Sequence, residues 1–489
     1  MSQPSLKKNF GYNILYQLLI VITSLVTSPY LTRIIGAEGL GIYTFTQSYA
    51  HYFVLFIMLG VNNYGTREIA KVRNNKKETS KVFWEIYSFQ GFMLVIISCA
   101  YAISVMVFIK ENQLIYLIQL MYVISSGLDI SWCCFGLEKF KLAVVRSLII
   151  KILSTALLFL LIHKPSDLWI YACLSAGTLF VSQFVVWLHI VNELHFKRPT
   201  LAGITKHIRP NLTLFLPVIA VSLYTIMNKL MLGLMDISTE VAFYTYAGRI
   251  VEIPETVITA LTTVMLPRTT NMIYTGKEED SSRLFSKSMQ LAMLFSFGAS
   301  FGLASVSDLF IPWYYGEAFS RCSQLTIWLC PVIIFNSWNG IVRNQHIIPK
   351  GYNKVYLLTV TAGALINFIL NYLMIPTLRG IGAVIGTVAT QFTVCLVQYI
   401  LTRREINYRI FWKDICAFCV SGIVMAFALA CIPMNINNTV IAIFVKVVIG
   451  AVIYVILSFA YLIKVKKDTS LVCVIFGMLP GLKKWKRLQ

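Results

Sequence analysis

Apolar runs long enough to cross a membrane recur along the whole chain, and they constrain its fold more than any other feature of the sequence. A transmembrane α-helix needs about 20 largely apolar residues to cross a hydrocarbon core about 30 Å thick. We expect an all-α polytopic membrane protein with 14 transmembrane helices, which lie near residues 11–31, 42–62, 82–109, 114–136, 144–162, 168–191, 212–235, 241–266, 288–311, 324–345, 355–375, 380–401, 414–432 and 439–463.

The amino-acid composition supports this class of fold. Of the 489 residues, 57% are hydrophobic and 13% are charged, whereas soluble domains carry about 25% charged residues. In a soluble protein, the formal net charge of +21 would suggest nucleic acid as a partner. Here the basic residues are divided among short segments between the apolar runs, so we expect the lipid bilayer as a partner and no nucleic acid.

The positions of the Lys and Arg residues predict the orientation of the chain, because cytoplasmic segments of membrane proteins are enriched in these residues. If the N-terminus is cytoplasmic, the basic stretches all fall on the inner side, at 63–81, 192–211, 267–287, 402–413 and 464–489. The outer loops then hold few cations, namely Arg33, Lys110, Lys164, Arg321 and Arg379. This alternation favours fourteen spans with both termini in the cytoplasm.

Several classes of membrane enzyme and pump do not fit the sequence. The segments between the predicted spans are too short to fold as soluble catalytic domains, and the chain has neither a G-x-x-x-x-G-K-[ST] phosphate loop nor an H-E-x-x-H zinc motif. Cys416 and Cys419 form a C-x-x-C inside a predicted span without a second Cys pair, which favours small apolar packing residues over a metal site. Nor does a cleavage pattern follow the apolar segment after Lys7 and Lys8. We expect no enzyme, no metal and no cofactor.

A short internal repeat suggests duplication. Residues 31–48 read "LTRIIGAEGLGIYTFTQS", and residues 227–249 read "MNKLMLGLMDISTEVAFYTYAGR". Arg33 aligns with Lys229, and after a longer loop Tyr43 aligns with Tyr244. This offset pairs the first predicted helix with the seventh, so the two halves would be parallel repeats of six helices. The expected domains are an N-terminal lobe at 1–196, a C-terminal lobe at 197–405, two extra helices at 406–463 and a basic tail at 464–489.

Ionisable residues inside predicted spans are the candidates for function, because each costs about 2.5–3.5 kcal/mol to insert and normally faces a partner or a water-filled cavity. The eighth predicted helix carries Arg249, Glu252 and Glu255 over two turns around Pro254, a residue that favours a kink. Two interpretations stay open. Arg249 and Glu252 form a neutralising pair that packs the lobe, or a cation lines a cavity beside a titratable carboxylate.

The remaining candidates have structural alternatives of the same kind. Lys229 could extend to the outer surface, Arg343 could anchor the topology, Asp129 could form a hydrogen bond between helices, and Arg33 could hold a turn. Cations outnumber carboxylates in this set, which favours an anionic ligand such as phosphate. Aromatic residues beside these cations could stack on sugar rings or belong to a membrane-interface belt, namely Tyr43, Tyr244 and Tyr246.

Six stretches, in chain order, read "LTRIIGAEGLGIYTFTQSY", "YGTREIAK", "GLDISWCCFGLEKF", "NKLMLGL", "FYTYAGRIVEIPETVITALTTVMLPR" and "INFILNYLMIPTLRGIGAVIGT". Together they resemble the polysaccharide-repeat flippases, which are the O-antigen and capsule transporters of the multidrug/oligosaccharidyl-lipid/polysaccharide exporter superfamily. They extend over the first twelve predicted helices. The sequence departs from the family at Lys229, where an aspartate often stands, and this puts in doubt any coupling role assigned there by analogy.

The resemblance implies two six-helix bundles around a cationic cavity that opens alternately to each side of the bacterial cytoplasmic membrane. The implied cargo is an undecaprenyl-diphosphate-linked oligosaccharide repeat unit, and the implied partners are a polysaccharide polymerase and chain-length machinery. We expect headgroup binding by Arg33, Lys229, Arg249 and Arg343, and coupling to an H+ or Na+ gradient, or charge pairing, by Glu252, Glu255 or Asp129.

The same fold also leaves a cation-coupled multidrug exporter and a peptidoglycan-precursor flippase as alternatives. A membrane polysaccharide polymerase is the alternative from a different class. It would need a large outer loop with catalytic residues, and the predicted outer loops are short.

Overall fold

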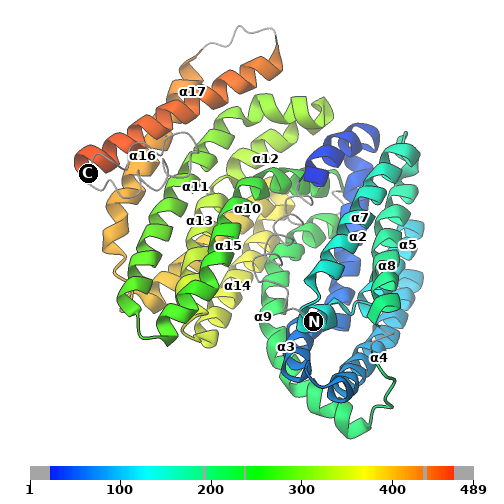
Figure 1. Cartoon of the computed structure of the whole chain (residues 1–489). Coiled ribbons are helices and arrows are strands. Elements are labelled where there is room, and N and C mark those ends of the chain that lie inside the picture. Colours follow the sequence, from blue (N-terminus) through cyan, green and yellow to red (C-terminus); the bar gives the residue numbers. More distant parts are fainter. Residues whose placement is uncertain (1–21, 191–193, 236–237, 433–437, 467–489) are drawn as a thin grey trace. The chain divides into compact units, whose positions relative to one another are not determined.

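The computed structural model describes residues 22–190, 194–235, 238–432 and 438–466 (Figure 1). Within these ranges the chain forms helices and no strand. It divides into two compact units, Met1–Phe243 and Tyr244–Gln489, which we call unit 1 and unit 2. The expected all-α fold is therefore confirmed. The lobes expected from the sequence repeat, with their boundaries at 196, 405 and 463, stay a prediction.

The first described helix of unit 1 covers residues 22–34. The helices that follow are α2 (Gly36–Met58), α3 (Val61–Val72), α4 (Lys76–Phe108), α5 (Gln113–Gly127), α6 (Ser131–Gly136), α7 (Phe140–Leu161), the short 3-10 turn η1 (Pro165–Asp167), α8 (Leu168–Ile190) and α9 (Leu201–Leu234). Trp132 lies at the centre of one core, where its ring stacks on that of Phe83 at 5.4 Å. A Cβ added at Gly65 would overlap the Trp132 ring, so only glycine lets α3 approach α6 this closely.

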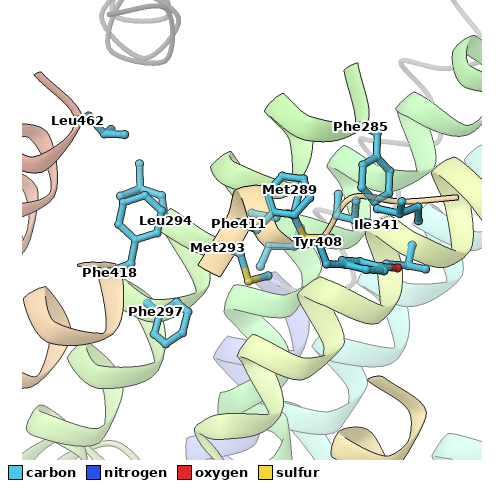
Figure 2. Packing of buried hydrophobic residues seen from close by; sticks show 14 of the residues in the cluster. Phe285, Met289, Met293, Leu294, Phe297, Ile341, Tyr408, Phe411, Phe418 and Leu462 are labelled. Carbon is cyan, nitrogen blue, oxygen red and sulfur yellow. The ribbon is translucent and has the colours of Figure 1, made fainter. Parts of the chain in front are cut away.

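Helix α10 (Ser238–Tyr274) begins in unit 1 and continues into unit 2. The other elements of unit 2 are α11 (Glu278–Tyr315), η3 (Glu317–Phe319), α12 (Arg321–Leu329), α13 (Pro331–Val342), the π-helical turn η4 (Arg343–Ile347), α14 (Asn353–Leu378), α15 (Gly380–Thr402), α16 (Arg409–Cys431), α17 (Thr439–Ala460) and the π-helical turn η5 (Tyr461–Val465). Figure 2 shows an apolar cluster of unit 2, in which Met289, Met293 and Phe297 of α11 pack with Phe411 and Phe418 of α16.

Eleven of the described helices are long and apolar enough to cross a membrane, or twelve if the two parts of α9 are one span bent by 49°. Each coincides with a predicted span. Two of the fourteen predicted spans have no counterpart among these helices. The one at 11–31 lies partly outside the described residues, and the one at 42–62 corresponds to α2, which contains Thr44, Thr46 and Gln47 among its apolar residues. The chain is a multi-pass membrane protein, and the count of fourteen spans and the parallel repeat stay predictions.

The glycines of the first quoted repeat have two separate roles. Gly36 has φ of 78°, and this left-handed conformation separates the helix over residues 22–34 from α2. Gly41 instead permits close packing, because an added Cβ would overlap the backbone carbonyl of Ser238.

Candidate functional site

Arg249 lies on the first half of α10 and is half-buried. Its guanidinium carbon lies 4.5 Å from the centroid of the Tyr246 ring. A guanidinium within about 6 Å of an aromatic face is attracted by the electrons of the ring. Tyr246 is itself 1% exposed and packs edge-on against Tyr315 and Phe319. The aromatic cluster therefore supports one face of the guanidinium and fixes its plane.

The tyrosines that the sequence suggested as sugar-stacking residues are all buried in this structure. The hydroxyl of Tyr43, on α2, lies 2.7 Å from that of Ser175 on α8. The hydroxyl of Tyr244, on α10, lies 2.8 Å from that of Thr387 on α15. The two residues paired by the sequence alignment thus form the same kind of contact in their separate units. Both hydroxyls face protein, and a role for these rings in stacking on sugar stays a prediction.

Glu255 lies less than two turns after Arg249 on the same helix. Its Oε2 accepts a hydrogen bond of 3.0 Å from the side-chain amide of Asn336 on α13. Its Oε1 is buried and has no hydrogen-bond partner among the described residues. Ionisation of a buried carboxylate whose second oxygen has no hydrogen-bond partner costs free energy, because a low-dielectric environment disfavours an uncompensated charge. This oxygen can accept a proton or contribute to binding a cation.

Helix geometry separates the three charges that the sequence placed together. At 3.6 residues per turn, each residue advances by about 100°, so six residues turn the side chain through about 240° relative to Arg249. Arg249 and Glu255 therefore point to different sides of α10, and Glu252 lies between them in an exposed position. The helix continues through Pro254 and Pro267 without ending. A kink at Pro254 stays a prediction.

Arg343 is the remaining candidate of unit 2. It is half-buried and begins the π-helical turn η4, and its Nε donates a hydrogen bond of 3.2 Å to the side-chain oxygen of Asn344. Single π-helical turns often mark functional positions, because they shift the direction of the side chains by one residue. This turn also places the polar side chains of Gln345 and His346 inside the unit.

The candidates of unit 1 lie on three different elements. Arg33 is exposed near the end of the helix over residues 22–34, and Lys229 is half-buried on α9. Nδ1 of His51 on α2 lies 2.6 Å from the hydroxyl of Tyr122. Asp129 lies in the break between α5 and α6, and its Oδ1 accepts a hydrogen bond of 2.9 Å from the backbone of Ser131. This contact gives Asp129 a local structural role.

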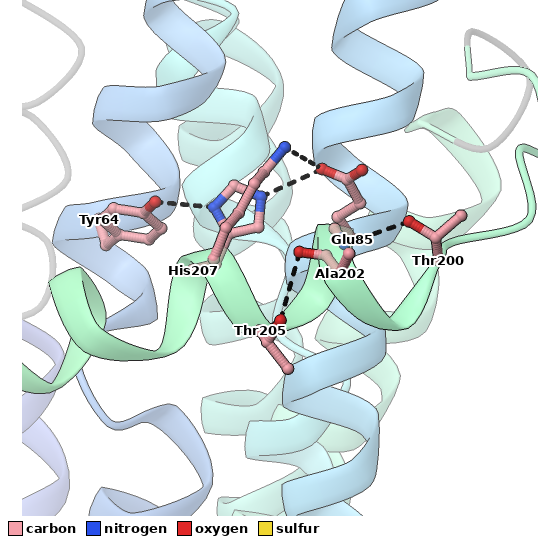
Figure 3. Close-up of polar contacts among 8 residues, drawn as sticks. Tyr64, Glu85, Thr200, Ala202, Thr205 and His207 are labelled. Atoms are coloured by element: carbon pink, nitrogen blue, oxygen red, sulfur yellow. Dashed lines mark hydrogen bonds and ion pairs between the residues drawn. The ribbon is translucent and has the colours of Figure 1, made fainter.

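The sequence did not point to a buried polar network in unit 1 that Figure 3 shows. Glu85 of α4 lies with its Oε2 2.7 Å from the ammonium of Lys206 and 3.2 Å from Nε2 of His207, both on α9. Nδ1 of His207 lies 2.7 Å from the hydroxyl of Tyr64 on α3. The network links three helices at the end of unit 1 that is predicted to be cytoplasmic. Tyr64, Lys206 and His207 fall in the predicted inner segments 63–81 and 192–211, whereas Glu85 falls at the start of the predicted span 82–109.

The part of the chain that the structure describes contains no candidate metal site, since no three His, Cys, Asp or Glu residues lie close enough together there to hold an ion. The site residues are instead single cations and carboxylates on long helices.

Comparison with known proteins identifies the family. A family model described as "Polysaccharide biosynthesis protein" matches residues 6–273, which is more than half of the chain. The chain belongs to this family. It is 22% identical over 406 residues to a protein from Escherichia coli (strain K12) that is named as an O-antigen transporter, with 82% of this chain and 97% of that protein covered. A protein of the same name from Shigella dysenteriae is 23% identical over 393 residues, with 79% and 95% covered.

Solved structures show the same fold. The structure named "Lipid II flippase MurJ, inward closed conformation" superposes with a TM-score of 0.74 at 14% identity, over 93% of this chain and 100% of that chain. A multidrug resistance MATE family transporter of the MOP superfamily, in an outward-facing conformation, gives a TM-score of 0.51 at 13% identity, over 82% and 96%. At these identities the likeness shows the fold, and the family match together with the two named relatives confirms the expected resemblance. The relatives are named as transporters and flippases, which agrees with a chain that transports rather than catalyses.

Proposed function

We propose that this member of the polysaccharide biosynthesis protein family is a flippase for undecaprenyl-diphosphate-linked oligosaccharide repeat units. It would move them across the bacterial cytoplasmic membrane for O-antigen, capsule or similar surface polysaccharide, with both termini in the cytoplasm. Membership of the family, together with two relatives named as O-antigen transporters, is the observation that carries this proposal.

Arg249 is the residue best suited to the diphosphate. Guanidinium groups bind phosphate through two parallel hydrogen bonds, and these charge-assisted bonds are stronger than neutral ones. The contact with the Tyr246 ring holds the plane of the guanidinium. Arg33, Lys229 and Arg343 are further candidates for headgroup contacts, in the exposed and half-buried positions described above.

Glu255 is the residue best suited to couple transport to an ion gradient. Its unpartnered Oε1 provides a position for a proton or for Na+, and binding there would remove the cost of the buried charge. Alternating access requires that such binding favour one conformation over the other, because a ligand shifts an equilibrium only by its difference in affinity for the two states. Glu252 and Asp129 are weaker candidates, since the first is exposed and the second accepts a hydrogen bond from the backbone N–H of Ser131.

Complementation tests the proposal. The chain is expressed in a bacterial host that lacks its own repeat-unit flippase but keeps the enzymes that build a matching repeat unit. Restored surface polysaccharide, with loss of the lipid-linked oligosaccharide that accumulates without a flippase, is the expected result. Continued accumulation in the presence of membrane-inserted protein would contradict it.

A peptidoglycan-precursor flippase is a second candidate, favoured by the TM-score of 0.74 to the lipid II flippase MurJ. Depletion of the host's own lipid II flippase discriminates between the two. Rescue of growth by this chain, without rescue of surface polysaccharide, would favour the second candidate.

A further inference from the structure

A polar cavity of about 170 Å³ lies within unit 2, where the start of α11, the π-helical turn η4 and the segment between α15 and α16 meet. One water molecule takes about 30 Å³ in the liquid, so this space suits a group of several heavy atoms rather than a single water. The basic stretches 267–287 and 402–413, both predicted to be cytoplasmic, contribute to its wall. The cavity is separate from Arg249 and Glu255, which do not line it.

Gln345 is the side chain in the wall that most requires a ligand. It is 2% exposed, and neither the oxygen nor the nitrogen of its carboxamide has a hydrogen-bond partner among the described residues. Buried amides are almost always hydrogen-bonded, because losing water without a replacement is unfavourable. One carboxamide offers both a donor and an acceptor, which suits a ligand that carries both on neighbouring atoms.

The charged groups of the wall leave no free cation for an anionic ligand. The ammonium of Lys350 lies 2.6 Å from Oε2 of Glu405, and Nε2 of His346 lies 3.2 Å from the same oxygen. Glu405 therefore neutralises Lys350, and Glu278 adds a further negative charge to the lining. A phosphate or a carboxylate would be repelled by this balance.

The rest of the lining combines hydroxyls with aromatic surface. Ser281, Ser282 and Ser286 come from one side of α11, and each hydroxyl can both donate and accept. Phe285 and Phe411 also line the cavity, with their ring centroids 6.1 Å apart. Figure 2 shows Phe285 at the edge of the apolar cluster of unit 2. An uncharged ring with an apolar face and a hydroxylated edge matches both kinds of surface.

We propose that this cavity binds an uncharged polyhydroxylated group of the size of one sugar ring. Gln345 would bond a pair of neighbouring hydroxyls, the serines would bond others, and the phenylalanines would contact the C–H face. The group could come from a free monosaccharide in the cytoplasm or from the sugar of a membrane glycolipid. This inference goes beyond the proposed function and does not depend on it.

Binding of sugars to the full chain tests the inference. The protein is purified in lauryldimethylamine oxide, because a maltoside detergent would itself offer sugar headgroups. Glucose, galactose, mannose, N-acetylglucosamine and glycerol are titrated, with inorganic phosphate as the anionic probe, and binding is measured by calorimetry and by the shift in Tm. We expect saturable binding of at least one of the sugars in the millimolar range and none of phosphate.

The variant Gln345→Leu keeps the size of the side chain but removes both hydrogen-bonding atoms, and we expect it to weaken sugar binding at least tenfold. Gln398→Leu is the matched control, because Gln398 is also buried with an unpartnered oxygen but lies on α15 outside the cavity. Ser286→Ala removes one lining hydroxyl and should weaken binding severalfold. It keeps the inference testable if Gln345→Leu does not fold.

Three results would overturn the inference: no saturable binding of any sugar in the set, binding of phosphate instead, or equal sugar affinity in the wild type and in the lining variants. A comparison of free glucose with a glucosyl-diacylglycerol in nanodiscs then identifies the source. Displacement of bound glucose by the glycolipid supports a membrane sugar, and unchanged glucose binding supports a free one.

Discussion

The guanidinium of Arg249 lies over the ring of Tyr246, 4.5 Å from its centroid, and that ring is held in place by Tyr315 and Phe319. A guanidinium in contact with an aromatic face is attracted by the electrons of the ring, so this contact orients the guanidinium. Unit 2 thus has a positioned cation on a helix long enough to cross a membrane. This relationship leads to the first prediction.

Arg249→Ala should reduce export of surface polysaccharide by about tenfold to a hundredfold, since a hydrogen bond to a charged group contributes about 1.5–3 kcal/mol. Arg249→Lys should recover only part of the activity, because an ammonium binds phosphate as a point charge and cannot form the bidentate contact. Export is measured per amount of membrane-inserted protein. Full activity of the alanine variant would remove Arg249 from the site.

Glu255→Gln should make transport independent of the H+ or Na+ gradient, because the amide cannot take up a proton or balance a cation at Oε1. Glu252→Gln tests the weaker candidate on the same helix, and because Glu252 is exposed its replacement should leave the dependence unchanged. Transport into vesicles is compared with and without each imposed gradient. The assignment fails if gradient dependence persists in Glu255→Gln or disappears only in Glu252→Gln.

The positions of the spans could be predicted because membrane insertion depends on a property of short segments, namely about 20 successive apolar residues. The eleven apolar helices all coincide with predicted spans for this reason. Side-chain partners could not be predicted in the same way. Glu85 and His207 are 122 residues apart in the sequence and meet only because α4 packs against α9.

The sequence also could not predict whether a side chain inside the bundle points at a neighbouring helix or into a cavity. Tyr43, Tyr244 and Tyr246 stand beside the candidate cations in the sequence, yet each ring is buried against protein. An apolar face that packs on a neighbouring helix and one that lines a cavity have the same helical period. The different directions of Arg249 and Glu255 could have been predicted from the sequence alone. Six residues at 3.6 residues per turn place the two side chains on different sides of a helix.

Gly203→Ala should destabilise unit 1 by about 1–3 kcal/mol, the usual effect of overpacking a well-packed position. A Cβ added at Gly203 would overlap the carboxylate of Glu85 and disturb its contacts with Lys206 and His207. Gly91→Ala is the matched control, because a Cβ added there, on α4, meets no atom within 4 Å. The control should be neutral or stabilising by about 0.5–1 kcal/mol. Thermal unfolding of both purified variants is the measurement, and equal Tm values would show that Glu85 moves aside without loss.

The ion pair of Glu405 should contribute stability that depends on pH. Glu405 lies between α15 and α16, outside the apolar spans. Partial burial raises the pKa of its carboxyl, but the hydrogen bond and charge of Lys350 and the hydrogen bond of Tyr352 lower it more, so the pKa lies below its ordinary value of 4.5. A group with a depressed pKa stabilises the folded state above its unfolded pKa and loses this effect as the pH falls through the folded pKa.

The difference in Tm between the wild type and Glu405→Gln should therefore be largest near neutral pH and shrink as the pH falls below the ordinary carboxyl pKa of 4.5. Its size should be modest, because the side chain is 36% exposed and water screens the pair. Lys350→Met removes the cation and should show the same pH dependence relative to the wild type. A difference in Tm that stays constant over this range would mean that the contact acts through packing and carries no charge effect.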